Sequence, residues 1–286
     1  MPELPEVETV ARCLQQQLVG DLVTAAHVLR PQTVASSDSD TFARSVVGRR
    51  FLAVRRRAKY LLLELEPQGF LLVHLRMSGR MRLVPGHEPC GVHIRLALDL
   101  ASGRSLRLDD QRTFGRVWLV DDLASVLKGL GPEPLSDEWD ADGFWRALER
   151  RHRMIKPLLL DQSLVAGLGN IYVDESLHRA GIHPARRSDS LRRDEAIRLH
   201  AAIREVLAEA IAHGGTTLRD YATPEGASGA YQFALQVYGR ENEPCGRCGA
   251  AIVKTRLAQR GTHYCPVCQP APDSFTVAMA AEGADG

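Results

Sequence analysis

Four cysteines in the last part of the chain have the spacing of a metal site. Cys245, Cys248, Cys265 and Cys268 form a C-x2-C-x16-C-x2-C pattern. Two close thiolate pairs on two tight turns supply the four ligands of a tetrahedral Zn²⁺ ion, and they leave no position open for a reacting water. A pair of disulfides is the alternative, but nothing else in the sequence indicates an oxidising compartment. We therefore predict one structural zinc ion, with a small β-hairpin in residues 249–264.

The start of the chain, MPELPEV, contains two prolines, two glutamates and no lysine. A proline at a first helical position and an acid in the first turn are typical of a helix start, which accounts for Pro5 and Glu6. This explanation does not cover Pro2 and Glu3, which precede the helix. Because Pro2 is a small second residue, we expect Met1 to be removed. The mature chain would then begin with a secondary amine.

A glycine-rich turn in residues 164–184, LVAGLGNIYVDESLHRAGIHP, is the next candidate site. Gly167 and Gly169 predict a tight turn, and Asn170 is predicted to be the N-cap of the following helix. Backbone N–H groups at such a helix start can bind a phosphate, and Lys156 lies just ahead, where its ammonium could reach the same phosphate. Taken alone, an ordinary helical hairpin explains this segment better.

Two further loops carry side chains that could enter a stack of bases. Met77 lies in HLRMSG, and Arg112 and Phe114 lie in DQRTFGR. An apolar wedge, an aromatic wedge and an arginine together could fill a gap in a base stack, although each residue singly fits a core position as well. The stretch RRFLAVRRRAK, residues 49–59, adds six positive charges without an acid, which could meet phosphates or form a solvated strand face.

The elements that must position these residues form two groups. Apolar residues from Val7 to Leu18 repeat with helical spacing, and short Leu- and Val-rich runs over residues 21–120 predict an antiparallel sandwich or barrel. The segment GLGPEPLSDEW, residues 129–139, predicts a domain boundary. Helices are expected at 140–151, 155–163, 170–180 and about 192–213, and a long loop is expected before the cysteine module.

Many short motifs, taken together, resemble the bacterial formamidopyrimidine-DNA glycosylase family, within the superfamily that includes endonuclease VIII. They follow one another over nearly the whole chain: PELPEVET, RRRAKYLLLEL, HLRMSG, RTFGR, GPEPLS, IKPLLLDQ, GLGNIY, GIHP, GGTTLRD, LQVYGR and QRGTHYCPVC. One such motif can arise by chance, but the ordered set is highly specific.

The resemblance implies an α+β protein with a defined division of the chain. An N-terminal helix and antiparallel β-sandwich would form a catalytic domain at 1–132. A helical domain with a helix–two-turn–helix motif would follow at 133–235, and a zinc finger at 236–270. Residues 271–286, which carry acids and no Lys or Arg, are expected to be a disordered tail.

The resemblance also implies an activity. The protein would excise oxidised purines, 8-oxoguanine and formamidopyrimidines, from duplex DNA and then cleave the strand at the abasic site by β,δ-elimination. The Pro2 amine would be the nucleophile and Glu3 the general acid, with Glu6 in a supporting role. An N-terminal amine has a lower reference pKa than lysine, so a larger fraction of it is neutral near pH 7.

Further site residues carry over from the family by position. Lys59, His74, Asn170 and Arg260 would form a phosphate clamp around the everted nucleotide. Lys59 and Arg260, which the resemblance places among the catalytic residues, would supply charge, and Asn170 would supply hydrogen bonds. The full expected DNA-binding set is His74, Met77, His93, Arg112, Phe114, Lys156 and Asn170. The loop at 219–232 would cap the damaged base.

Two alternatives remain at this point: the same scaffold acting on oxidised pyrimidines, as in the endonuclease VIII branch, and a zinc-dependent DNA-binding protein without catalysis. We expect a monomeric bacterial protein in the cytoplasm, with damaged double-stranded DNA as its partner and no membrane association. The sequence has no basic stretch followed by an apolar core at its start and no apolar run of membrane-spanning length.

Overall fold

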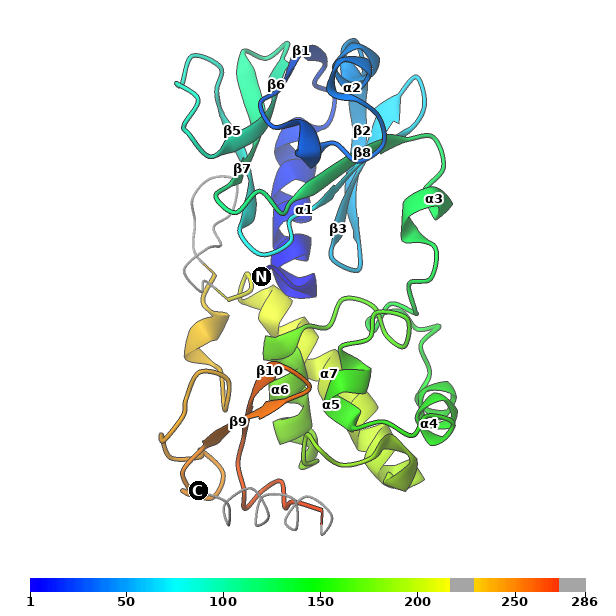
Figure 1. The fold of residues 1–286 in the computed structure, drawn as a ribbon, viewed down its shortest axis with the longest axis vertical. Helices are drawn as coiled ribbons and strands as arrows, with labels where there is room; N and C mark the ends of the chain where they lie inside the picture. The colour runs from blue at the N-terminus through cyan, green and yellow to red at the C-terminus, as the bar shows by residue number, and fades with distance from the viewer. Residues whose placement is uncertain (217–228, 273–286) are drawn as a thin grey trace. The chain divides into compact units, whose positions relative to one another are not determined.

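The computed structural model describes residues 1–216 and 229–272 (Figure 1). The chain forms two compact units. One consists of Met1–Lys128 with Ala210–Gln232, and the other of Gly129–Glu209 with Phe233–Gly286. Most of the expected base-capping loop, 219–232, and nearly all of the expected disordered tail, 271–286, lie outside the described residues.

The first unit contains helix α1 (Leu4–Leu18) and two four-stranded antiparallel sheets. One sheet has the order β2 (Arg50–Arg57), β3 (Tyr60–Glu66), β4 (Phe70–His74) and β8 (Arg116–Val120). The other has the order β1 (Val23–Val28), β6 (Ile94–Leu100), β7 (Arg104–Asp110) and β5 (Gly79–Pro85). This arrangement confirms the predicted helix and antiparallel β-sandwich.

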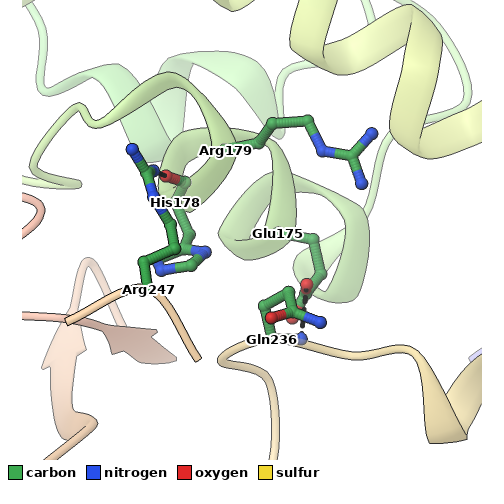
Figure 2. A pocket seen from close by; sticks show the side chains of 5 residues that line it. All are labelled: Glu175, His178, Arg179, Gln236 and Arg247. Carbon is green, nitrogen blue, oxygen red and sulfur yellow. Dashed lines mark hydrogen bonds between the residues drawn. The ribbon is translucent and has the colours of Figure 1, made fainter. Parts of the chain in front are cut away.

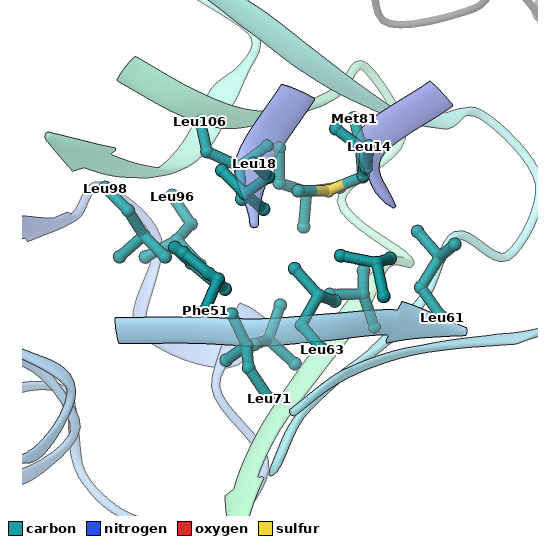
Figure 3. Packing of buried hydrophobic residues seen from close by; sticks show 14 of the residues in the cluster. Leu14, Leu18, Phe51, Leu61, Leu63, Leu71, Met81, Leu96, Leu98 and Leu106 are labelled. Atoms are coloured by element: carbon teal, nitrogen blue, oxygen red, sulfur yellow. The ribbon is translucent and has the colours of Figure 1, made fainter. Parts of the chain in front are cut away.

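The core of this unit lies between α1 and the inner faces of both sheets. Leu14 and Leu18 of α1 lie among Leu63 of β3 and Leu98 of β6 (Figure 3). In β3 buried and partly exposed residues alternate, as expected for a strand with one face in a core. The helix position is therefore set by the same apolar residues that hold the two sheets together.

Three short helical elements of this unit were not predicted: η1 (Pro31–Thr33), α2 (Ser39–Val46) and α3 (Ala124–Leu127). The Asp38 side chain caps α2 by accepting the Thr41 N–H at 2.9 Å, and Phe42 and Val46 are fully buried. An Asp before an apolar pair at helical spacing is a local signal that could have identified α2.

The second unit is built from helices followed by a small hairpin. Its elements are α4 (Ala141–Glu149), α5 (Ile155–Leu159), α6 (Asn170–Ala180), η2 (Ser188–Ser190), most of α7 (Arg193–Ala212), β9 (Val253–Leu257) and β10 (Arg260–Tyr264). A further short element, η3 (Tyr231–Phe233), spans the division between the units. The predicted helical part and the predicted hairpin between the cysteine pairs are both confirmed.

The expected helix at 155–163 was too long, because α5 ends at Leu159. Beyond it, side chains replace the helical backbone pattern. The Asp161 carboxylate accepts hydrogen bonds from the Ser163 N–H at 3.1 Å and the Ser163 hydroxyl at 2.7 Å. Gln162 accepts the Gly167 N–H at 2.9 Å and donates to the carbonyl of Leu168 at 2.9 Å. These bonds build an irregular turn ahead of α6.

Within residues 1–216 and 229–272, no helix combines the length and the apolar character that crossing a bilayer would require.

The sandwich core predicts a large difference between two leucines on neighbouring strands. Leu63 of β3 is fully buried, whereas Leu52 of β2 is 45% exposed. Leu63→Ala should lower the free energy of unfolding by about 3 kcal/mol, because it leaves a cavity between the sheets. Leu52→Ala should cost less than about 1 kcal/mol. Urea denaturation of both variants tests this, and equal losses would contradict the described core.

Candidate functional site

The N-terminal turn is buried and held by a reciprocal pair of glutamates. Pro2 is buried, and Glu3 and Glu6 are each only 2% exposed. Glu3 is the N-cap of α1 and its carboxylate accepts the Glu6 amide N–H, while the Glu3 N–H donates to Glu6 Oε2 at 2.9 Å. Two backbone donors at the helix start, those of Glu3 and Glu6, are thereby satisfied.

The second oxygen of Glu6 ties this turn to a distant part of the same unit. Glu6 Oε1 accepts hydrogen bonds from the Thr216 N–H at 2.8 Å and the Thr216 hydroxyl at 3.0 Å. Gly215 has a φ of +78°, and a Cβ on it would lie 2.8 Å from Glu6 Oε1, so only glycine fits there. Tyr231 in turn donates its N–H to the Gly215 carbonyl at 3.0 Å. Glu6 therefore links the chain start to one flank of residues 217–228, and Gly215 bonds that flank to Tyr231 on the other.

Lys59 and His74 lie at the ends of neighbouring strands. Lys59 is in the two-residue turn between β2 and β3, and Tyr60 pairs directly with His74 across β3 and β4. Both side chains are more than nine-tenths buried. Burial, helped by the positive charges of Arg76 and Lys59, lowers the pKa of His74 from 6.5 to about 3.

The hydrogen-bond partner of His74 determines what this neutral ring can do. Its Nδ1 accepts the Arg76 backbone N–H at 3.0 Å. In a neutral imidazole the other nitrogen, Nε2, then carries the hydrogen and is a donor. His74 is thus suited to donate a hydrogen bond to an anion, next to the cationic Lys59.

A buried carboxylate connects the two loops that carry the predicted wedge residues. Asp110 has no exposed area, and its two oxygens accept the Ser78 hydroxyl at 2.5 Å and the Gly115 N–H at 2.7 Å. The Arg112 N–H also points at Asp110, at 3.2 Å. Sequence reasoning missed Asp110, although an acid at the end of a strand and beside a polar loop was a signal for it.

The wedge residues themselves are presented outward. Met77 is 42% exposed and Phe114 is 44% exposed, which is unusual for large apolar side chains on ordered turns. The Arg112 guanidinium lies over the Phe114 ring, 4.8 Å from its centroid. The exposure argues against the core explanation for these two apolar residues. His93 is also exposed, and its carbonyl accepts the Asp110 N–H at 2.9 Å, so it adjoins the same loop.

Left-handed backbone conformations gather beside the predicted DNA-contacting side chains. Six residues other than glycine have a positive φ among those described. Five of them lie within two residues of such side chains: Ala58 before Lys59, Arg76 before Met77, Thr113 between Arg112 and Phe114, and the pair Ala258 and Gln259 before Arg260. This conformation costs residues with a Cβ free energy, and such costs are found where function requires one side-chain direction.

The second unit brings together Asn170, Lys156 and the start of β10. The prediction that Asn170 is the N-cap of α6 was wrong. Gly169 is the N-cap, and Asn170 is the first helical residue. The Asn170 side chain instead donates to the Gly261 carbonyl at 2.8 Å. Arg260, directly before Gly261, is exposed. A contact 91 residues away could not be inferred from local capping preferences.

Lys156 is buried inside the second unit, whereas the sequence predicted an ammonium group that reaches a phosphate. Its side chain has no exposed area, and its Nζ is 2.7 Å from Asp174 Oδ1 and 2.8 Å from the Gly261 carbonyl. The expected direct reach to a phosphate at the surface is therefore replaced by contacts inside the unit. Sequence reasoning did not identify Asp174, its fully buried partner.

The four cysteine sulfurs converge as the zinc prediction requires. All four lie within 4.8 Å of one another, with 3.9 Å between Cys245 and Cys268 and 3.4 Å between Cys248 and Cys265. Tetrahedral zinc with bonds of about 2.3 Å places its sulfurs about 3.8 Å apart, so the site fits this ion. Backbone N–H groups of Arg247 and Cys268 point at two of the sulfurs, at 3.4 Å each.

A pocket beside the cysteine module contains none of the predicted site residues. Its lining residues are Glu175, His178, Arg179, Gln236 and Arg247 (Figure 2). Glu175 accepts the backbone N–H groups of residues 236, 237 and 238 at 2.8 to 2.9 Å. Burial raises the pKa of Glu175, and these three donors oppose that shift. The pocket therefore marks where the module is fastened to α6, another role that sequence reasoning missed.

Comparison with known protein families assigns nearly the whole chain. Residues 1–117 match the formamidopyrimidine-DNA glycosylase N-terminal domain, residues 130–222 match the formamidopyrimidine-DNA glycosylase H2TH domain, and residues 242–271 match a zinc finger found in FPG and IleRS. The formamidopyrimidine-DNA glycosylase of Herpetosiphon aurantiacus is 49% identical, with 94% of this chain and all of that protein covered. That of Pelotomaculum thermopropionicum is 46% identical, with 94% and 99% covered.

Solved structures of similar chains contain DNA. A Lactococcus lactis FPG mutant, G226P, in complex with DNA containing Fapy-dG has a TM-score of 0.90 at 39% identity, covering 94% of this chain and all of that one. A complex between the Lactococcus lactis protein and DNA containing an abasic site has a TM-score of 0.89 at 40% identity, with the same coverage.

The neutral state of His74 predicts a specific effect of acid on stability. A histidine has an ordinary pKa of 6.5, and that of folded His74 is about 3. Between these values the unfolded chain binds a proton that the folded chain does not, so His74 makes stability fall as the pH falls. His74→Gln should remove up to about 1.4 kcal/mol of this loss per pH unit. Urea denaturation from pH 6.5 down to pH 4 measures it.

The control for that measurement is His87→Gln, which changes an exposed histidine. It should reproduce the pH dependence of the unchanged protein. If His74→Gln also follows the unchanged curve, His74 is not held neutral by its surroundings, and its assignment as a donor through Nε2 is wrong.

Proposed function

The chain belongs to the formamidopyrimidine-DNA glycosylase family, and we propose from this membership how its own residues perform the reaction. The protein is a DNA glycosylase of base excision repair with AP lyase activity. Its substrate is double-stranded DNA containing oxidised purines or abasic sites. Duplex DNA as substrate and a reduced four-thiolate site support the bacterial cytoplasm as its place of action.

The nucleophile is the nitrogen of Pro2, once Met1 has been removed. This secondary amine attacks C1′ of the damaged nucleotide, and the bond from C1′ to the oxidised base breaks. The amine gives up its proton and the departing base takes one up, which leaves the Pro2 nitrogen bonded to C1′ of a sugar ring that is still closed. When the bond from C1′ to the ring oxygen breaks, the nitrogen and C1′ form an iminium, the Schiff base of a secondary amine. The positive start of α1 lies next to this nitrogen, which favours the neutral amine over its protonated form.

Glu3 acts as the general acid. It follows the nucleophile directly, and its carboxyl group would protonate the ring oxygen of the sugar and open the ring. Loss of the C2′ proton from the iminium then expels the 3′ phosphate, and a second elimination expels the 5′ phosphate. Hydrolysis of the iminium finally releases the sugar fragment and returns the free amine.

Glu6 supports these two residues without touching the sugar. Its carboxylate accepts the Glu3 N–H and both donors of Thr216, so each oxygen is already occupied. We infer that Glu6 holds the chain end in one direction, and this fixed, buried turn is the observation that carries the proposal. Orientation of this kind can supply a large share of a rate enhancement.

Each unit has donors that would bind the DNA backbone. Lys59 and His74 would contact phosphates from the first unit, and Asn170 and Arg260 from the second. Lys59 and Arg260 contribute charge and therefore salt dependence, whereas the neutral His74 and Asn170 contribute hydrogen bonds. His93 would add a contact beside the wedge loops.

Met77, Arg112 and Phe114 would fill the space that the everted nucleotide leaves. Extrusion of a base costs a few kcal/mol, and inserted side chains offset that cost. The guanidinium of Arg112 can donate to the acceptors of the cytosine that has lost its partner. Their two loops share the Asp110 carboxylate, which supports their acting as one set.

Zinc has a structural part in this scheme. The ion would be held by Cys245, Cys248, Cys265 and Cys268, and it would supply folding energy to a module with a very small core of its own. That module carries β10 and hence Arg260.

Covalent trapping tests the proposal. Borohydride should reduce the iminium on a duplex with 8-oxoguanine opposite cytosine and leave a protein–DNA adduct on a denaturing gel. Addition of residues ahead of Pro2 should abolish the adduct, since the nitrogen becomes an amide. Glu3→Gln should abolish base excision on the 8-oxoguanine duplex, because an amide cannot donate the proton.

Glu8→Gln is the matched control, because Glu8 lies on the same helix and pairs with the exposed Arg12 and the largely buried Arg56 rather than with the chain end. It should keep normal trapping. An adduct that persists with the N-terminal extension would contradict the role of Pro2. Adducts only with oxidised pyrimidines would assign the substrate to the endonuclease VIII branch.

A further inference from the structure

A fully buried ion pair lies under the predicted phosphate-binding residues of the second unit. Lys156 of α5 and Asp174 of α6 have side chains with no exposed area, and their charged atoms are 2.7 Å apart. A buried pair gains little net stability over apolar residues of similar size. Its presence therefore calls for a role other than stabilisation.

Lys156 also binds the backbone of β10 and so helps to fix its position. Its Nζ donates to the Gly261 carbonyl at 2.8 Å, and the Asn170 amide donates to the same carbonyl, also at 2.8 Å. Gly261 directly follows Arg260. One carbonyl thus receives two donors from α5 and α6, and this fixes the strand immediately beside the exposed guanidinium.

Asp174 fixes the other side of the same strand. Its Oδ2 accepts the His263 N–H at 2.9 Å, while Oδ1 binds Lys156. Asp174 therefore reaches β10 twice, directly at residue 263 and through the lysine at residue 261. Between these attachment points and the left-handed turn at Ala258 and Gln259, Arg260 has little freedom of backbone direction.

We propose that Asp174 and Lys156 are positioning residues, which hold the hairpin so that Arg260 and Asn170 meet the same stretch of DNA backbone. This inference rests on the proposed function, in which Arg260 binds a phosphate. It gives Lys156 an indirect part in DNA binding: the lysine touches no phosphate, and its charge is neutralised by Asp174. The pair contributes to affinity only through the residues that it orients.

The test is a double-mutant cycle read through salt dependence. Binding is measured to a duplex with a tetrahydrofuran abasic-site analogue, as the slope of log affinity against log salt. Arg260→Ala should reduce the slope by about 0.9, the share of one phosphate contact. Asp174→Asn should weaken binding by about fivefold. It should also reduce the slope by about 0.9, as Arg260→Ala does. In the Arg260→Ala background, Asp174→Asn should have almost no further effect on binding.

Two comparisons separate positioning from general damage. Glu195→Gln changes another buried acid of this unit, one that holds Arg186 through contacts of 2.6 and 2.8 Å, and it should leave the slope unchanged. Lys156→Met with Asp174→Leu removes both charges without leaving one unpaired, so this variant should fold and still show the reduced slope. One zinc per chain in each variant verifies that the module is intact.

The outcomes distinguish the inference from the proposed function. A reduced slope in Arg260→Ala but a normal slope in both variants of the pair would overturn the positioning role and leave the phosphate contact standing. A normal slope in Arg260→Ala itself would overturn that contact and, with it, the inference. Additive losses in the cycle would show that Asp174 acts on binding independently of Arg260.

Discussion

The position of the chain end depends on one buried carboxylate, that of Glu6. It accepts three hydrogen bonds, from the Glu3 N–H and from the N–H and hydroxyl of Thr216. A chain terminus is ordinarily the least ordered part of a domain. Here the capping box and the apolar face of α1 hold the residues directly after it in a buried turn. The proposed role of Pro2 as the nucleophile depends on this constraint.

Around the proposed DNA-binding surface, too, the protein accepts a cost in stability where this fixes the direction of a side chain. Five left-handed residues lie within two positions of the side chains that would contact DNA, and none of them is a glycine. Glycine would adopt these conformations at lower cost, but it would also allow others. The network around Asp110 and the pair of Lys156 with Asp174 have a comparable effect: buried charges are retained where they fix a loop or a strand. The protein thus restricts its binding groups before DNA arrives.

Features with short-range causes could be predicted from the sequence. The cysteine spacing predicted the zinc site because only a metal or disulfides explain four such residues. Helical periodicity predicted α1, and regularly spaced turns predicted the antiparallel strands. The same local signals gave the hairpin between the cysteine pairs. The family resemblance added the functional assignment of residues that periodicity alone would have placed in turns.

Features with long-range causes could not be predicted. Asn170 has the residue type of an N-cap, but its amide binds Gly261, far along the chain, and Gly169 takes the capping position. Lys156 looked like a surface cation because its partner, Asp174, is 18 residues away on another helix. Helix α5 was predicted too long because the side chains of Asp161 and Gln162 supply hydrogen bonds that the backbone pattern does not reveal.

The proposed mechanism requires that the chain end, and no lysine, forms the covalent bond to DNA. Peptide mapping of the borohydride-trapped adduct by mass spectrometry tests this directly. Trypsin should release residues 2–12, PELPEVETVAR, carrying the reduced sugar remnant on the nitrogen of Pro2. A remnant on Lys59 or any other lysine, with an unmodified peptide 2–12, would contradict the account.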